Sequence, residues 1–94
     1  MIELSVLKTP EEIALSVRDA VKKRRKEMKL TQAEIAKKSG VSLGSYKRFE
    51  HSGEISFRSL IDIAFVLDCQ NDFLNLFSQK KYNSIQDVIN ERKK

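Results

Sequence analysis

The sequence contains few of the residues from which catalytic and metal sites are usually built. It has one histidine, one cysteine and no tryptophan among its 94 residues. The single cysteine, Cys69, excludes an internal disulfide and fits a reducing compartment. There is no glycine-rich phosphate loop and no His/Glu spacing typical of metal ligands. We therefore expect a protein that is not an enzyme and that needs no cofactor and no metal.

Long hydrophobic runs are also missing. No apolar stretch approaches the roughly 18–20 residues of a membrane span, so we expect no membrane association. The N-terminal residues lack the basic-then-apolar layout of a secretory signal, which favours a cytoplasmic location. An apolar content of 40% with 33% charged residues is typical of a globular protein. We expect residues 1–94 to form one domain, with core helices over about 10–77 and a C-terminal extension over 78–94.

Positive charge is concentrated in one part of the chain. Between Arg18 and Arg48 there are eleven Lys/Arg and three Asp/Glu, a net charge of +8, whereas the remainder has seven basic and ten acidic residues, a net charge of −3. This asymmetry suggests a surface that meets phosphates, and a solvated basic helix face is the alternative. The basic run over residues 22–26 points around more than one helical turn, so only part of it could face one ligand.

Four segments begin with helix-capping sequences. The segment 9–12 has threonine at the N-cap, proline at the first helical position and glutamate where it closes a capping box. The segment 31–34 repeats the threonine-to-glutamate box, and Ser42 and Ser56 cap two further helices. Hydrophobic staples support the last three starts, through the pairs Leu30/Ile35, Val41/Tyr46 and Ile55/Leu60.

The spacing of apolar residues predicts an all-α fold of five or six short helices. The first helix carries a stripe with spacings of three and four, comprising Ile13, Val17, Ala20, Val21, Arg24 and Met28. The fourth helix has an inner face of Leu60, Ile61, Ala64 and Leu67. A short fifth helix opens at Asn71 or Asp72 and runs through Phe73, Leu74 and Phe77. The sixth helix, in the six-helix alternative, begins at Ser84 and has Ile85, Val88 and Ile89 inward. Ile2, Leu4 and Val6 alternate like a strand, which would pair across a dimer or stay loose.

The segment 31–53 predicts two helices separated by a tight turn at Gly40, where a positive backbone angle is cheap for glycine. On the second of these helices, Tyr46 and Phe49 point back toward the core. The opposite face and the N-terminal end then present Ser42, Leu43, Gly44, Ser45, Lys47 and Arg48. Helix, turn and helix with a basic outer face is the arrangement that places a recognition helix in the DNA major groove.

This pattern resembles the helix-turn-helix of the lambda repressor/Cro (Xre) family, through Gln32, Ala36, Gly40 and the pair Tyr46/Phe49. The resemblance covers about residues 13–77 and implies a lambda-repressor-like fold that binds double-stranded DNA. It also implies that Gln32 contacts a backbone phosphate and braces the recognition helix. The outer-face residues would contact bases and flanking phosphates. Arg25 and Glu50 lie where the family often buries an ion pair that supports the scaffold.

The recognition helix departs from the family pattern at its N-terminal end. Leu43 and Gly44 stand where relatives often carry glutamine, so bidentate readout of adenine is not available there. Leu43 could contact a thymine methyl group, and Gly44 could allow close approach of the backbone. Tyr46 is bulkier than the usual valine or isoleucine. Direct base specificity is therefore expected to depend mainly on Arg48, a natural reader of guanine.

Residues from Arg48 onward look like HipB-like antitoxins, which are encoded beside HipA-type kinase toxins. The similarity is carried by apolar residues over 73–77 and by the pattern Ser84, Ile85, Asp87, Val88 and Ile89. The alternative is that this segment completes the core or a dimer interface. His51 is expected to interact with the dipole at a helix C-terminus rather than with a phosphate, and Cys69 to be a small buried residue.

Two functions remain open at this point. The leading hypothesis is a sequence-specific DNA-binding regulator, a repressor that binds a palindromic operator as a homodimer. The alternative is an antitoxin that holds a kinase toxin and autoregulates its operon.

Overall fold

The computed structural model describes residues 8–78, which form five helical elements and no strand. In chain order these elements are α1 (Pro10–Glu27), α2 (Gln32–Ser39), α3 (Leu43–Ser52), α4 (Phe57–Val66) and the 3₁₀ helix η2 (Gln70–Asn75). The all-α fold is therefore confirmed. The predicted N-terminal strand, the sixth helix and most of the proposed C-terminal extension lie outside the described residues.

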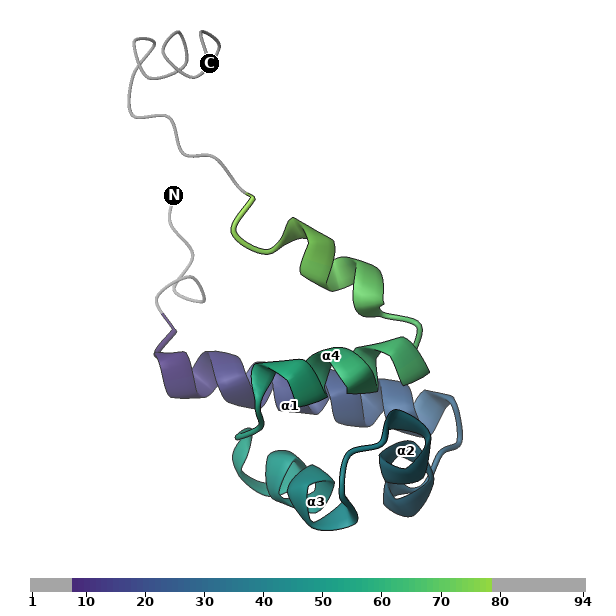
Figure 1. Cartoon of the computed structure of the whole chain (residues 1–94). Coiled ribbons are helices and arrows are strands. Elements are labelled where there is room, and N and C mark those ends of the chain that lie inside the picture. Colours follow the sequence, from purple (N-terminus) through teal and green to yellow (C-terminus); the bar gives the residue numbers. More distant parts are fainter. Residues whose placement is uncertain (1–7, 79–94) are drawn as a thin grey trace, which may run out of the picture.

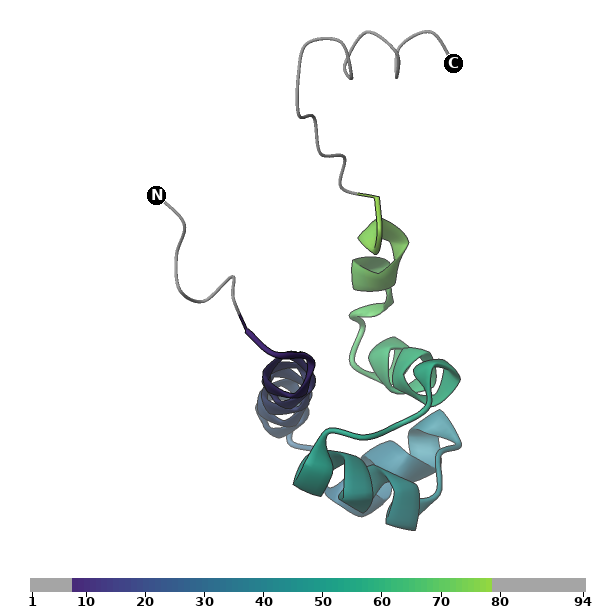
Figure 2. The same ribbon diagram turned by 90° about the vertical axis from the view of Figure 1, so that its left-hand side faces the viewer.

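Figures 1 and 2 show how the elements are arranged in space. Helices α2 and α3 form one edge of the structure, and α1 and α4 lie above them. The 3₁₀ helix η2 extends from α4 on the side opposite to α2 and α3. The helix-turn-helix pair is thus left uncovered by the other described elements at its outer edge.

All four predicted N-caps are present. Thr9 and Thr31 each form a complete capping box, with Glu12 and Glu34 respectively. Ser42 and Ser56 accept hydrogen bonds from the backbone N–H groups of Ser45 and Ser59. These contacts link residues three positions apart and satisfy N–H groups that have no partner within the helix. The starts of the helices are therefore set by local sequence.

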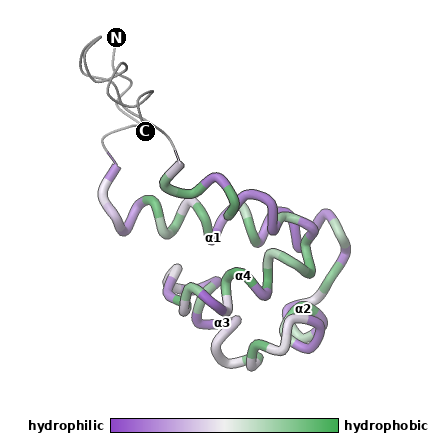
Figure 3. Tube along the Cα trace, turned by 45° about the horizontal axis from the view of Figure 1, so that its top comes forward, coloured by the Kyte–Doolittle hydropathy of each residue, from purple (hydrophilic) through white to green (hydrophobic). Residues whose placement is uncertain are grey.

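The buried core lies where α2, α3 and α4 meet. Its largest side chains, Ile35, Tyr46, Phe49, Ile63 and Leu67, are at most 2% exposed. Tyr46 and Phe49 pack edge to face, with ring centroids 6.1 Å apart. Figure 3 shows hydrophobic residues along α4, the helix that packs on α2. The predicted inward direction of Tyr46 and Phe49 is confirmed, whereas Ile63 was missed as a member of the α4 inner face.

The predicted apolar stripe of α1 is only partly right. Ile13, Val17, Ala20 and Met28 are exposed, and Val21 is half-buried against the core. The fully buried residue of α1 is Arg25. The stripe misleads because the side of α1 that meets α3 faces a carboxylate and backbone carbonyls, which require hydrogen-bond donors rather than apolar groups.

The fifth element also differs from its prediction. It begins at Gln70, before the expected Asn71 or Asp72, and it is a 3₁₀ helix without a side-chain cap. It ends at Asn75, so Phe77 lies beyond it, with φ of +60° and a fully exposed side chain. Phe73 packs against Phe57 with ring centroids 5.7 Å apart. The element is thus attached to α4 while much of its apolar surface stays in solvent.

Two glycines end helices with left-handed backbone conformations. Gly40 ends α2 with φ of +79°, as predicted, and Gly53 ends α3 with φ of +80°. At Gly53 a β-carbon would lie 3.3 Å from the backbone carbonyl group of Ala14. Gly53 therefore serves both a turn and the close approach of α1 to the end of α3.

Among the described residues, no helix is both long enough and apolar enough to cross a membrane.

Candidate nucleic-acid interface

The outer face of α3 is an open surface. The six side chains that were predicted to contact DNA from this region are all exposed, namely Ser42, Leu43, Gly44, Ser45, Lys47 and Arg48. The first turn of α3 contains no acidic residue. The two cations follow on the next turn. This distribution leaves the N-terminal end of α3 free of groups that would repel phosphate. Contact of these residues with DNA stays a prediction.

The serine hydroxyls at the start of α3 are partly occupied by each other. The Ser42 hydroxyl accepts from the backbone N–H of Ser45 at 3.1 Å and donates to the Ser45 hydroxyl at 2.8 Å. Each hydroxyl still has acceptor capacity, and the Ser45 hydroxyl still has its own proton to donate. The end of the helix is therefore both capped and able to form further hydrogen bonds.

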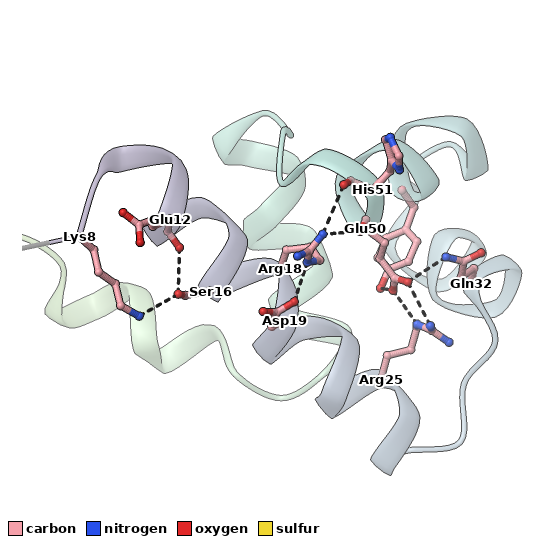
Figure 4. Close-up of polar contacts among 10 residues, drawn as sticks. Lys8, Glu12, Ser16, Arg18, Asp19, Arg25, Gln32, Glu50 and His51 are labelled. Carbon is pink, nitrogen blue, oxygen red and sulfur yellow. Dashed lines mark hydrogen bonds and ion pairs between the residues drawn. The ribbon is translucent and has the colours of Figure 1, made fainter. Parts of the chain in front are cut away.

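Behind this surface lies a buried polar network centred on the Glu50 carboxylate (Figure 4). Its Oε2 accepts from Arg25 Nε at 2.8 Å and from the Tyr46 hydroxyl. Its Oε1 accepts from Arg25 Nη2 at 3.2 Å and from Gln32 Nε2 at 2.8 Å. Both carboxylate oxygens thus accept two hydrogen bonds, from α1, α2 and α3 together. The ion pair expected between Arg25 and Glu50 is present, and it is bidentate.

The network changes the acid–base properties of its members. Burial raises the pKa of the Glu50 carboxyl, but hydrogen bonds from Arg25, Tyr46 and Gln32 outweigh it and leave the pKa below its ordinary value. Burial, followed by the hydrogen bond to Glu50, raises the pKa of the Tyr46 hydroxyl. Both shifts favour an ionised carboxylate and a neutral phenol. The network therefore consists of one ion pair with two neutral hydrogen-bond donors.

Gln32 connects this network to the molecular surface. It is the first residue of α2 and is half-buried. One hydrogen of its amide nitrogen is donated to Glu50, so the predicted bracing of α3 has a physical basis. A primary amide carries a second N–H. That second donor is the group available for a phosphate contact, which stays a prediction.

Arg18 forms a second brace, which sequence reasoning missed. Its Nη1 donates to the backbone carbonyl of Glu50 at 3.0 Å and to that of His51 at 3.3 Å (Figure 4). Its Nε contacts Asp19 at 2.7 Å. A cation at the last carbonyls of α3 satisfies groups that lack partners within the helix and is favourable with the helix dipole. The long sequence separation left no local signal for this contact.

The basic residues 22–26 of α1 point in different directions, as their helical spacing predicts. Arg25 is buried in the network, and Arg24 is half-buried, with its Nε 3.3 Å from the Leu67 carbonyl oxygen. Lys22, Lys23 and Lys26 are exposed. Only part of the run therefore faces outward, as its helical spacing predicts.

The two residues with metal-binding or reactive side chains have ordinary surroundings. His51 is exposed in the last turn of α3. Cys69 is half-buried, less than predicted, and its Sγ lies 3.4 Å from the Leu67 carbonyl oxygen. Over residues 8–78, no group of three or more His, Cys, Asp or Glu side chains could hold a metal ion.

Comparison with known proteins gives one match that agrees with this geometry. The family described as Helix-turn-helix matches residues 21–73, which is 53 of the 94 residues and extends from the second half of α1 into η2. No curated protein and no solved structure gives a significant match. The matched region contains α2, the Gly40 turn and α3 together with the buried network that holds them. The chain therefore belongs to the Helix-turn-helix family, a family of DNA-binding transcription regulators.

Proposed function

We propose that the protein is a sequence-specific transcription repressor that places α3 in the major groove of a palindromic operator. The observation that supports this most strongly is the combination of an exposed, acid-free N-terminal end of α3 with a buried network that fixes α3 to α1 and α2. A recognition helix must present its side chains in a fixed register to discriminate bases. A regulator acting on chromosomal DNA would work in the cytoplasm, and repression follows if the operator overlaps a promoter.

The chemistry of the outer face defines how the groove would be contacted. Leu43 would contact a thymine methyl group, and Arg48 would read the O6 and N7 atoms of guanine. Gly44 would allow the backbone to approach the groove. Lys47 and Gln32 would contact phosphates. Since few of these side chains can form directional contacts with bases, most of the affinity would come from phosphates, and DNA shape would add to the specificity.

Salt dependence is the direct test of this proposal. The full chain, titrated by fluorescence anisotropy against a mixed operator library, should bind with an affinity that falls steeply as salt rises. Each neutralised phosphate contributes about 0.9 to the slope of log K against log salt. Sites enriched from that library should then bind more tightly than scrambled DNA of equal length. Binding that is independent of both salt and sequence would contradict the proposal.

Dimerisation would occur through apolar side chains at η2 and the end of α4. Leu74 is 77% exposed, Phe65 is 63% exposed, and Leu76 and Phe77 are also exposed. Several large exposed apolar side chains within a short segment are typical of an interaction site. A second copy is the occupant that the operator requires, because one helical unit reads only a few base pairs. The element η2 lies on the side of α4 opposite to α2 and α3 (Figures 1 and 2), so pairing through η2 leaves α3 free.

Replacing Leu74 and Phe77 together with serine should convert the protein to monomers and weaken operator binding, because the apolar contact area is lost. Sedimentation equilibrium of the full chain measures the first effect, and anisotropy measures the second. Ile13→Ser is the matched control, since Ile13 is also an exposed apolar residue but belongs to α1. A double variant that stays dimeric would assign the interface elsewhere.

The same apolar surface favours a second candidate function, that of an antitoxin which covers it with a HipA-type kinase toxin. In that case the chain, purified untagged from its own cells, would carry a stoichiometric kinase encoded by the adjacent gene. A chain that purifies only with copies of itself would favour the free-standing repressor.

A further inference from the structure

Glu54 is an exposed acidic residue beside the proposed DNA-binding surface, and DNA binding alone does not explain its presence there. Between Lys37 and Ile55 the only two acidic residues are Glu50, which is buried, and Glu54, which is exposed. Glu54 immediately follows Gly53, the residue that ends α3. Its carboxylate therefore adds a negative charge beside the surface that is proposed to meet phosphates, where it would oppose binding.

The structure places this carboxylate against Arg48. Glu54 Oε2 lies 3.2 Å from Arg48 Nη2. The Ser52 hydroxyl supports the arrangement, because it donates to the Arg48 carbonyl at 2.9 Å and accepts from the Glu54 backbone N–H at 3.3 Å. The two charged side chains and three nearby hydroxyls line an open hollow of about 330 Å³ between α3 and the start of α4.

The pair is too exposed to serve the stability of the fold. The Arg48 and Glu54 side chains are 71% and 67% exposed, and ion pairs of this kind contribute little to folding. A guanidinium nevertheless has five N–H donors in a fixed plane. One contact to Glu54 restricts where that plane points and leaves donors for a base edge. It also offsets part of the charge with which Arg48 would otherwise bind any phosphate.

From this geometry we propose that Glu54 is a specificity-determining residue, which orients Arg48 for a base edge and prevents it from binding phosphates indiscriminately. The inference rests on the proposed function. It predicts that Glu54 lowers total affinity while it raises discrimination between operator and other DNA. An acidic residue beside the proposed recognition helix would then increase specificity, although it lowers the total affinity for DNA.

The test uses the full chain, an operator selected from a random library, and a scrambled duplex of the same length. Glu54→Gln should tighten binding to the scrambled duplex by about threefold and increase its salt slope by about 0.9, as the released Arg48 gains a phosphate. Binding to the operator should change less, so the ratio of the two affinities falls. Glu11→Gln is the matched control, because it removes one exposed negative charge from the first turn of α1, outside α2, α3 and η2.

Dependence on Arg48 separates this role from general repulsion by a negative charge. In an Arg48→Met background, Glu54→Gln should leave the affinity ratio and the salt slope nearly unchanged. The inference is wrong if Glu54→Gln alters operator and scrambled binding by the same factor, or acts equally with and without Arg48. A wild-type protein that shows neither salt dependence nor sequence preference would instead contradict the proposed function itself, so the two failures are distinguishable.

Discussion

Glu50→Gln should lower the free energy of unfolding by about 3–5 kcal/mol, the usual cost of removing one partner from a buried ion pair. The Glu50 carboxylate accepts four hydrogen bonds, which come from Arg25, Gln32 and Tyr46. Glutamine has the same shape but offers one acceptor oxygen, and its amide N–H groups would face those donors. The buried Arg25 would be left without its counter-charge. Since a protein of this size has about 5–15 kcal/mol of stability in total, the variant should be close to unfolding.

Urea denaturation followed by circular dichroism measures this loss. Glu27→Gln is the matched control, because Glu27 belongs to α1, is exposed and lies 3.7 Å from Arg24. Such a pair contributes at most about 1 kcal/mol. A destabilisation by Glu50→Gln that is no larger than that of Glu27→Gln would mean that the network does not hold the helices together.

The pH dependence of the same experiment identifies the charge as the cause. The folded pKa of Glu50 is lower than its ordinary value, which is about 4.3 in an unfolded chain. The ionised carboxylate therefore contributes its full stabilisation above that pH, and the contribution is lost as the pH falls through the folded pKa. The difference in stability between wild type and Glu50→Gln should consequently be constant near neutral pH and shrink in acid. A difference that persists unchanged in acid would indicate a steric effect.

The parts of this fold that could be predicted are those set by neighbouring residues. Each capping contact joins positions three apart, so the starts of α1, α2, α3 and α4 follow from sequence alone. The Gly40 turn belongs to the same class, because a positive φ at a helix end is favourable for glycine wherever it occurs. The fifth element was harder to place, since it has no side-chain cap and therefore no local signal for its start.

The contacts that position α3 could not be predicted from the chain by local rules. Arg18 and the carbonyl of Glu50 are 32 residues apart, and the Arg25–Glu50 pair was anticipated only through resemblance to a family. Apolar periodicity gave only part of the inner face of α1, because the donors that α3 requires are carried by Arg18 and Arg25, which an apolar pattern does not include. The Tyr46 hydroxyl was likewise judged by its bulk, whereas it completes the shell around Glu50.

The outer face of α3 presents the opposite case, since its residues were identified correctly as exposed but their roles depend on a ligand. Arg48 shows the difference. Its position on the surface follows from helical spacing, but its contact with Glu54 depends on the path of the chain after Gly53, which spacing does not describe.

Arg48→Met should reduce binding to the selected operator by about 5–150-fold, which corresponds to the roughly 1–3 kcal/mol of a good bidentate contact with a base. Methionine is unbranched and has a high helix propensity, but it provides no hydrogen-bond donor for guanine. Binding to scrambled DNA should fall much less, because in the wild type Glu54 already neutralises part of the Arg48 charge. Fluorescence anisotropy at a fixed salt concentration compares the two duplexes.

Lys47→Met provides the matched control, since Lys47 precedes Arg48 on α3, is exposed and also carries one positive charge. It should weaken operator and scrambled binding by similar factors and reduce the salt slope by about 0.9, as expected for a phosphate contact. Both variants should unfold at nearly the wild-type urea concentration, because neither side chain is buried. Equal losses on the two duplexes for Arg48→Met would assign Arg48 to the phosphate backbone and would leave base recognition to the start of α3 and to the shape of the DNA.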